Sequence, residues 1–260
     1  MEELNIIITD THFGIKSNSV KWLNHQMYGL EEIKEYIITN KPKYDIVNII
    51  HCGDVFDNRS SINTMILKNI REKLYELADL VDVFYIIAGN HDYYSPKEDF
   101  KEINSLDLLL QHPKIILITN KYLMSKNQPI RKCFVPWYEF DRMNDIIENE
   151  SPDIIFTHGD LYEFKNIYNA NIISGHIHVP VSYGNAKNIG SLFAMNFADA
   201  NQERGFYTYE NNELKNLLQY RKNKDIKNAH NFMLENDSLV KHGTTDFDTR
   251  EIGFYLSKEN

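Results

Sequence analysis

Residues 46–57 read IVNIIHCGDVFD, an apolar run that ends in a glycine and two acidic residues. The run Ile46–His51 lacks the alternation of a half-exposed strand, which is typical of strands covered on both faces. A glycine after such a strand lets the chain turn sharply out of the sheet. The stretch therefore predicts a buried strand that places Asp54 and Asp57 at the edge of a sheet.

Four further blocks of polar residues follow apolar runs in the same way. They are Asp10-Thr11-His12, Gly89-Asn90-His91-Asp92, Thr157-His158-Gly159-Asp160 and Gly175-His176-Ile177-His178. In open α/β sheets, ligands bind at the carboxyl ends of the strands, and each block follows such an end. We therefore expect the five blocks to meet in space and to form one site.

Short apolar runs alternate with helical patterns along the chain, which predicts an α/β layered fold. The other candidate strands are Asn5–Thr9, Val83–Ala88, Ile115–Thr119, Cys133–Pro136, Ile154–Thr157 and Ile172–Ser174. The candidate helices are Val20–Thr39, Ile62–Leu77 with Ser61 as its N-cap, Ser95–Leu110, either continuous or broken near Ser105, and Glu139–Asn149. Residues 183–209 are expected to be rich in β structure, with a turn at Gly184-Asn185.

The functional groups in the blocks indicate a metal site. Carboxylate, amide and imidazole groups without thiolates suit Mn²⁺, Fe²⁺ or Zn²⁺. Two such ions roughly 3.5–4 Å apart polarise a phosphoryl group and activate a water molecule near neutral pH. The chain has neither a G-x-S-x-G motif nor a glycine-rich phosphate loop ending in Lys-Ser/Thr. Acyl hydrolysis and nucleotide-driven motor action therefore lack support.

The ordered set D-x-H, G-D-x-x-D, G-N-H-D, H and G-H-x-H, over about residues 6–178, resembles the calcineurin-like metallophosphoesterases. The resemblance implies a metal-dependent hydrolase of phosphate esters with a four-layer α-β-β-α sandwich of two mixed sheets. It also implies two metal ions that share one bridging carboxylate, Asp54. One ion would be held by Asp10, His12, Asp54 and His178, and the other by Asn90, His158, His176 and the same Asp54.

The same resemblance implies roles for residues that do not bind metal. His91 would lie over the site, stabilise the pentacovalent phosphate and protonate the leaving oxygen. Asp57 would orient His91 by a hydrogen bond, and Asp92 would be a structural acid. Asp57 is alternatively a helix-capping acid ahead of Ser61. Arg59 contacts the phosphate of a substrate or pairs with an acidic residue.

A narrower set of motifs resembles the SbcD-type DNA repair nucleases, in compact form the recombination endonuclease subunit of tailed phages. The motifs are the stretches DTHFG at 10–14, GDVFD at 53–57, NIGS at 188–191 and ERGFY at 203–207. The resemblance implies a two-metal, Mn²⁺-dependent endo- or exonuclease of recombination and repair. Its expected partners are DNA and a coiled-coil ATPase repair subunit (SbcC-like), and a homodimer is a further expectation.

The alternative is a free-standing metallophosphoesterase that acts on nucleotides, cyclic nucleotides or phosphoproteins. The net charge of −9 favours it, because an acidic chain binds nucleic acid poorly by charge alone. Trp137 and Tyr138, after Pro136, either stack on a base or pack beside the site. A scaffold that keeps the fold without the chemistry would lack ligands, and no ligand position of the family pattern is missing.

We expect a metallophosphoesterase domain over residues 1–210. Residues 211–260 would form a C-terminal extension, either a partner-docking segment or a partial cap. The chain has two cysteines, and Cys52 lies in a predicted buried strand, which favours reduced core thiols. A cytoplasmic setting follows, which is the host cytoplasm if the chain is viral. No apolar stretch approaches the roughly 18 residues of a membrane span.

Overall fold

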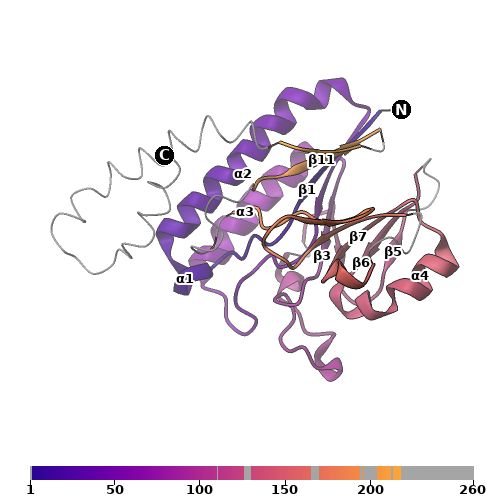
Figure 1. Cartoon of the computed structure of the whole chain (residues 1–260). Helices are drawn as coiled ribbons and strands as arrows, with labels where there is room; N and C mark the ends of the chain where they lie inside the picture. The colour runs from indigo at the N-terminus through magenta and orange to yellow at the C-terminus, as the bar shows by residue number, and fades with distance from the viewer. Residues whose placement is uncertain are drawn as a thin grey trace, which may run out of the picture.

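Two six-stranded sheets form the centre of the computed structural model. The structure describes residues 2–109, 111–125, 130–164, 170–193, 195, 204–211 and 213–217, and the rest of the chain lies outside the described residues. Among these residues, the elements of the first sheet come from both ends of the chain. The second sheet comes from its middle (Figure 1).

The first sheet has the strand order β12-β11-β1-β2-β3-β4. Its strands are β1 (Glu3–Ile8), β2 (Ile46–His51), β3 (Val83–Ile87), β4 (Ile115–Ile118), β11 (Tyr207–Glu210) and β12 (Glu213–Asn216). Strands β1 to β4 run parallel, and β11 and β12 add antiparallel neighbours. Ile8 pairs with His51, and His51 pairs with Ile86. The first three parallel strands therefore end level with one another.

The second sheet has the order β5-β6-β7-β8-β10-β9. Its strands are β5 (Leu123–Met124), β6 (Lys132–Val135), β7 (Ile154–His158), β8 (Asn171–Gly175), β9 (Val181–Tyr183) and β10 (Ala186–Asn188). Both edge strands are antiparallel to their neighbours and the inner pairs are parallel. Both sheets are therefore mixed, as the family resemblance implied. The predicted turn at Gly184-Asn185 joins β9 to β10.

Helices cover the outer faces of the sheets. Figure 1 shows α2 (Val20–Asn40) and α3 (Thr64–Leu80) side by side along the first sheet, with α4 (Met143–Glu150) against the second. Three apolar cores separate the layers. Ile6 and Ile8 of β1 pack in the core under α2 and α3, whereas Ile7 packs between the sheets. Because alternate side chains enter different apolar cores, the strands are apolar on both faces and the four-layer sandwich is confirmed.

The helix α3 begins later than the sequence predicted. The predicted N-cap Ser61 is wrong, since the Asn63 side chain accepts hydrogen bonds from the main-chain nitrogens of Met65 and Ile66. An asparagine at this position satisfies donors that the first helical turn leaves free. The buried face of α3 then carries apolar side chains at helical spacing: Ile66, Ile70, Leu74 and Leu77.

The predicted helix Ser95–Leu110 is wrong. The described part of this segment forms two 3₁₀ turns, η2 (Glu98–Phe100) and η3 (Ser105–Leu109). Its main chain is used in longer-range contacts: Tyr94 N donates to Ile103 O at 2.9 Å, and Ser105 N donates to Asp92 O at 2.7 Å. A continuous helix would break these hydrogen bonds. The segment instead folds back onto the block that contains His91.

Other boundaries also differ from the sequence prediction. The predicted helix Glu139–Asn149 is a 3₁₀ turn, η4 (Trp137–Arg142), followed by α4. The short strands β5 and β12 were not predicted, and β12 carries the first sheet past residue 210, the expected end of the domain. The remaining elements are η1 (Lys41–Lys43), η5 (Leu161–Phe164) and α1 (Ile15–Asn18), of which α1 has left-handed backbone angles at Lys16 and Ser17.

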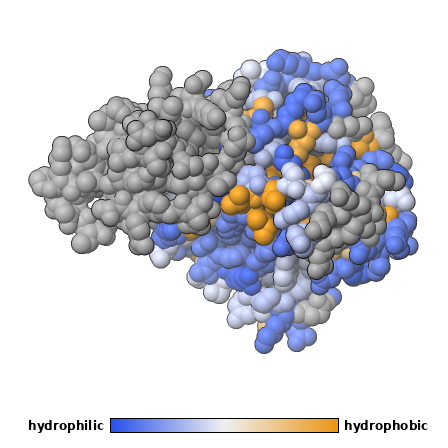
Figure 2. Space-filling model, viewed as in Figure 1, coloured by the Kyte–Doolittle hydropathy of each residue, from blue (hydrophilic) through white to orange (hydrophobic). Residues whose placement is uncertain are grey.

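The surface seen in Figure 2 is mostly hydrophilic, with separate small groups of hydrophobic residues. Within the described ranges, no helix has the length and apolar composition needed to cross a membrane.

Candidate metal centre

All five polar blocks lie at the carboxyl ends of strands, at β1, β2 and β3 of one sheet and at β7 and β8 of the other. The block after β1 is fixed against the block after β2, because Asp10 N donates to Gly53 O at 2.9 Å and His12 N donates to Asp54 O at 3.1 Å. Asp10, His12, Asp54 and His176 all have positive φ angles between 43° and 83°. Such strain in non-glycine residues is held by surrounding contacts and is common at functional sites.

Glycines allow the blocks to approach one another. A Cβ atom at Gly89 would lie 2.3 Å from Asp54 Oδ1. A Cβ atom at Gly175 would lie 1.9 Å from Thr9 Oγ1. Both distances are far inside van der Waals contact, so these two positions need glycine for the blocks to meet.

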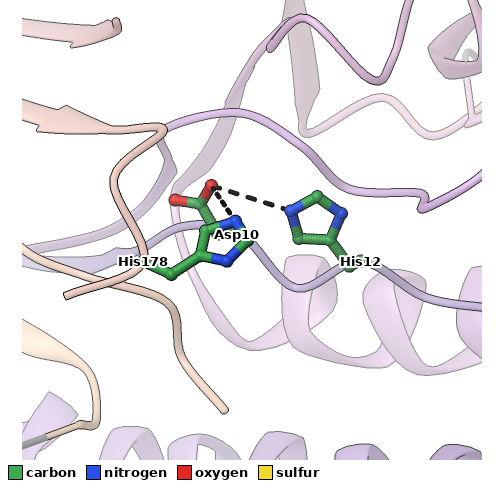
Figure 3. A group of neighbouring side chains, drawn as sticks. All are labelled: Asp10, His12 and His178. Carbon is green, nitrogen blue, oxygen red and sulfur yellow. Dashed lines mark ion pairs between the residues drawn. The ribbon is translucent and has the colours of Figure 1, made fainter. Parts of the chain in front are cut away.

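The side chains converge in overlapping groups whose possible ligand atoms lie within 4.8 Å of one another. One group joins Asp10, His12 and His178; His12 Nε2 lies 3.8 Å and His178 Nε2 3.7 Å from Asp10 Oδ1 (Figure 3). A second joins Asp54, His158 and His176, with His158 Nε2 3.3 Å from Asp54 Oδ2. A third joins Asp54 and His12 with His91.

Asn90 completes the second group. Its Oδ1 atom lies 3.1 Å from His158 Nε2 and 2.9 Å from His176 Nδ1. Every residue predicted from the sequence as a metal ligand therefore lies in one continuous cluster. Asp54 lies between the two ends of this cluster, and it is the residue to which the family resemblance assigns a bridging role.

The cluster fits divalent cations. Both ring nitrogens of His12 are buried and make no hydrogen bond with the described residues, although carboxylate oxygens lie 3.4 to 3.8 Å away. Asp10 and Asp54 are buried at 0% and 2% exposure. Buried polar groups without hydrogen-bond partners are costly, and a cation removes that cost for carboxylates and imidazoles alike. The donor set, carboxylate, imidazole and amide oxygen, suits two transition-metal ions.

Electrostatics support the same interpretation. Burial lowers the pKa of His12, but Asp10, Asp57 and Asp54 outweigh burial and raise it to about 10. Burial also opposes the charged form of His158, yet mainly Asp54 raises its pKa to about 9. Burial raises the pKa of Asp54, and the neighbouring histidines, His158 first, hold it below its usual value. Protons on His12 and His158 thus supply positive charge that bound metal ions would otherwise supply.

His91 and Asp57 lie beside the cluster. His91 Nδ1 is 2.8 Å from the main-chain oxygen of Asp57, so the predicted hydrogen bond between these residues runs through the backbone. The Asp57 carboxylate instead lies 3.4 Å from His12 Nδ1. Asp57 does not cap α3, because that helix begins at Thr64 and its N-cap residue is Asn63. The rings of His91 and His12 are 4.8 Å apart, centroid to centroid.

Asp92 holds the second and third blocks together. Its carboxylate accepts hydrogen bonds from the main-chain nitrogens of Asp54, Val55, Phe56 and Gly89, at 2.9 to 3.3 Å. Burial and the nearby Asp54 charge raise the pKa of Asp92 to about 7, against the lowering effect of these main-chain donors. Asp92 is fully buried and touches main chain at four places, as expected of a structural acid.

Two side chains that the sequence analysis missed support the first block. Thr9 Oγ1 donates to Asp10 Oδ2 at 2.7 Å and so orients that carboxylate. Gln26, on α2, donates from Nε2 to the carbonyl oxygen of Thr11 at 2.6 Å. Gln26 lies three residues after Leu23 and four before Leu30, on the apolar face of the helix. An amide side chain at helical spacing within the apolar face of a predicted helix is the sequence signal that could have identified Gln26.

Three further predicted residues have simpler surroundings. Arg59 is partly buried and makes no ion pair with the residues that the structure describes. The Tyr138 hydroxyl donates to Ser95 O at 2.6 Å, and its ring packs edge-on against Tyr93, 4.5 Å between centroids. Trp137 packs against Tyr138 and the core under α2 and α3. Both aromatic side chains therefore make the packing contacts that one of the two sequence interpretations expects.

Comparisons with known proteins agree with this geometry. Residues 6–180 match the family model described as calcineurin-like phosphoesterase. The chain is 25% identical over 222 residues to exonuclease subunit 1 of Enterobacteria phage T4. The match covers 77% of this chain and 62% of that protein, so the chain spans about three fifths of the curated relative's length.

Solved structures that the chain resembles include an NAD nucleotidase and a nuclease. The nucleotidase, from Haemophilus influenzae, is 11% identical with a TM-score of 0.45, and the match covers 83% of this chain and 49% of that one. The nuclease MPE of Pseudomonas putida is 14% identical with a TM-score of 0.37, over 68% and 62% of the two chains.

Proposed function

Because the chain belongs to the calcineurin-like phosphoesterases, metal-dependent hydrolases of phosphoester bonds, we propose that it is a two-metal DNA nuclease of the SbcD-like recombination and repair type. The observation that carries hydrolysis is the position of Asp54 between two groups of ligands. The choice of DNA as substrate is supported by the sequence match to a phage exonuclease subunit.

The proposed ligands divide into two sets around Asp54. One set is Asp10, His12, Asp54 and His178, and the other is Asn90, His158, His176 and Asp54. Mn²⁺ is the proposed ion, with Fe²⁺ and Zn²⁺ as alternatives that the same donors accept. When bound, such ions supply Lewis acidity and lower the pKa of water.

His91 is the proposed general acid. A carbonyl oxygen only accepts, so the contact with the main-chain oxygen of Asp57 places the His91 proton on Nδ1. Nε2 is then the ring nitrogen available to hold a proton for a leaving oxygen. The position of the His91 ring beside His12 puts it close to any phosphate bound at the cluster. Arg59, partly buried and not ion-paired within the described ranges, is the proposed phosphate contact.

The proposal includes partners. A chain with a net charge of −9 gains little from diffuse attraction to DNA. We therefore propose that a coiled-coil ATPase subunit, or a second copy of this chain, helps to hold the polymer. Residues 211–260 are the proposed docking or capping extension, and beyond residue 217 they lie outside the described residues. Free thiols at Cys52 and Cys133 suit a reducing compartment, and we place the protein in the cytoplasm.

The test is Mn²⁺-dependent cleavage of end-labelled single- and double-stranded DNA by the full chain. A phosphomonoester and a small phosphodiester are run alongside, and His91→Ala is the control variant. We expect the parent to cut DNA and the variant to be far slower, with the product ladder distinguishing endo- from exonucleolytic action. Intact DNA with rapid turnover of the small esters would overturn the nuclease proposal in favour of a free-standing phosphoesterase.

A further inference from the structure

The main-chain oxygen of His178 is held by several donors. Arg204 Nη1 donates to it at 2.7 Å and Ser191 N at 3.0 Å, and Ser191 Oγ, whose proton is directed at Phe193 O, lies 3.4 Å from it. Ser191 is fully buried and Arg204 is 6% exposed. One carbonyl oxygen has two lone pairs, so it is saturated by these contacts. The peptide group after His178 therefore has a fixed position.

Such an anchor matters because the His178 side chain is not enclosed. Its side chain is 32% exposed, whereas Asp10, which it faces at 3.7 Å, is fully buried. His158 is held differently, because it is buried and its Nδ1 lies 2.7 Å from Cys52 O. A side chain that is one-third exposed can adopt several rotamers, because packing restricts it only in part. A fixed backbone position at His178 therefore limits the directions that its imidazole can take.

The same segment also binds the residue between β1 and Asp10. Leu192 N donates to Thr9 O at 3.1 Å, and Ile189 N donates to Ser174 O at 3.0 Å. Thr9 directly follows β1 of the first sheet, and Ser174 lies in β8 of the second. Residues 189–193 thus join the ends of β1 and β8, which are the strands that precede the three residues drawn in Figure 3.

Arg204 connects this segment to the first sheet. Its Nη1 hydrogen-bonds to Ser191 Oγ and lies 3.4 Å from Phe193 O, while Ser191 Oγ donates to Phe193 O at 2.7 Å. Arg204 precedes β11, which pairs directly with β1. The two hydrogens of Nη1 serve the His178 carbonyl oxygen and Ser191 Oγ, so this one nitrogen holds both groups close to the guanidinium plane. Gly190, at φ 72°, leaves room for Pro180, because a Cβ there would lie 2.6 Å from Pro180 Cδ.

We propose that Ser191 and Arg204 are positioning residues that hold His178 against Asp10 and set the affinity of one of the two metal positions. The inference rests on the ligand sets of the proposed function. It gives a role to the NIGS and ERGFY motifs, of which Glu203 alone lies outside the described residues. Among the described residues, Ser191 and Arg204 form side-chain hydrogen bonds with His178, with Phe193 and with each other. None of these hydrogen bonds reaches Asn90, His158 or His176, which form the other metal position.

The test is a calorimetric titration of the metal-free full chain with Mn²⁺, fitted to two sites. For Arg204→Met and Ser191→Ala we expect one site to weaken by about 10- to 100-fold, while the other keeps its affinity. Arg204→Lys, which keeps one donor and the charge, should recover part of the loss. Arg142→Met is the matched control, because Arg142 is 62% exposed and, within the part of the chain that the structure describes, forms an ion pair with Glu139 only. It should titrate like the parent.

His178→Ala identifies the affected site. If Arg204 acts through His178, the double variant His178→Ala/Arg204→Met should bind no more weakly than His178→Ala alone. Equal weakening of both sites, or two unchanged sites in Arg204→Met, would overturn the inference. If Arg204→Met does not fold, Ser191→Ala decides by the same criteria. A parent protein that binds no Mn²⁺ would overturn the proposed function itself, which is a different result from unchanged variants.

Discussion

The Nδ1 atom of His91 lies 2.8 Å from the main-chain oxygen of Asp57. The carboxylate of the same aspartate lies 3.4 Å from a different imidazole, that of His12. The position of the backbone at 57 is set independently of this side chain, because Asp57 N donates to Phe13 O at 3.1 Å. Side-chain substitution at Asp57 should therefore leave the orientation of His91 intact.

We expect Asp57→Asn to weaken metal binding more than it slows the chemical step. The carboxylate supports His12, and partners of this kind contribute about 10- to 100-fold to metal affinity. At saturating Mn²⁺ the cleavage rate should fall by less than about tenfold, because His91 keeps its main-chain acceptor. Rates measured over a range of Mn²⁺ concentrations separate the two effects. A loss at saturating metal as large as that of His91→Ala would contradict this division of roles.

His91→Ala should slow cleavage by about 10²–10⁴-fold, the usual effect of losing a general acid. Its metal content, measured by elemental analysis after gel filtration, should equal that of the parent. Loss of metal from this variant would also have a structural reason, because a ring nitrogen of His91 lies within 4.8 Å of possible ligand atoms of His12 and Asp54. Release of metal by His91→Ala would make His91 a ligand and exclude the role proposed for it.

Asp54→Ala should remove both metal positions, because Asp54 groups with His158 and His176 at one end of the cluster and with His12, a member of the other end, in a second group. Asp10→Ala should remove only the position formed with His12 and His178. The measurement is the number of Mn²⁺ ions bound per chain at equilibrium. Retention of one ion by Asp54→Ala would contradict a bridging role for this carboxylate.

Metal binding should strengthen as pH rises from about 6.5 to 9. His12 and His158 have pKa values raised to about 10 and about 9, above the ordinary 6.5. In the metal-free protein their stabilising charge is complete below pH 6.5 and is lost as pH rises through those folded values. Metal ions must displace the same protons. The melting temperature of the metal-free protein should therefore fall across this range, while the gain on adding Mn²⁺ grows. A gain independent of pH would contradict protonated His12 and His158.

Asp92→Asn should destabilise the fold by about 2–5 kcal/mol. Each carboxylate oxygen accepts two main-chain hydrogen bonds, and an amide nitrogen in place of one oxygen leaves two buried donors without an acceptor. Chemical denaturation of the metal-free variant measures the change without interference from metal binding. The control is Asp107→Asn, at an exposed position, which should change the free energy of unfolding by less than about 0.5 kcal/mol.

Much of the candidate site could be predicted from the sequence, because each ligand directly follows a strand that is apolar on both faces. His51, at the end of β2, pairs with Ile8 and Ile86, so neighbouring blocks start at the same level. The carboxyl ends of parallel strands lie at the same edge of a sheet, whatever residues the following loops contain. The identity of the polar residues then limited the chemistry to oxygen and imidazole ligands.

The structure differed where local pattern and longer-range contacts compete. The residues Ser95-Pro96 have the pattern of a helix N-terminus. In the structure, however, Tyr94 N donates to Ile103 O and Ser105 N donates to Asp92 O, so these donors are not available to a helix. The N-cap of α3 moved from Ser61 to Asn63, because Asn58 Oδ1 accepts from the main-chain nitrogens of Ser60 and Ser61 and holds that turn out of the helix. Both outcomes depend on hydrogen bonds that periodicity does not encode.

The sequence by itself determined the layered α/β class, the strand ends and the blocks of oxygen and imidazole side chains that follow them. These follow from hydrophobic period and residue chemistry, which are local properties. The tertiary structure alone decided that the carboxylate of Asp57 faces His12 instead of His91, and that Arg204 holds the carbonyl of His178. Both are contacts between segments far apart in the chain. Their geometry exists only after the two sheets have packed, because packing sets which loop ends lie within hydrogen-bonding distance.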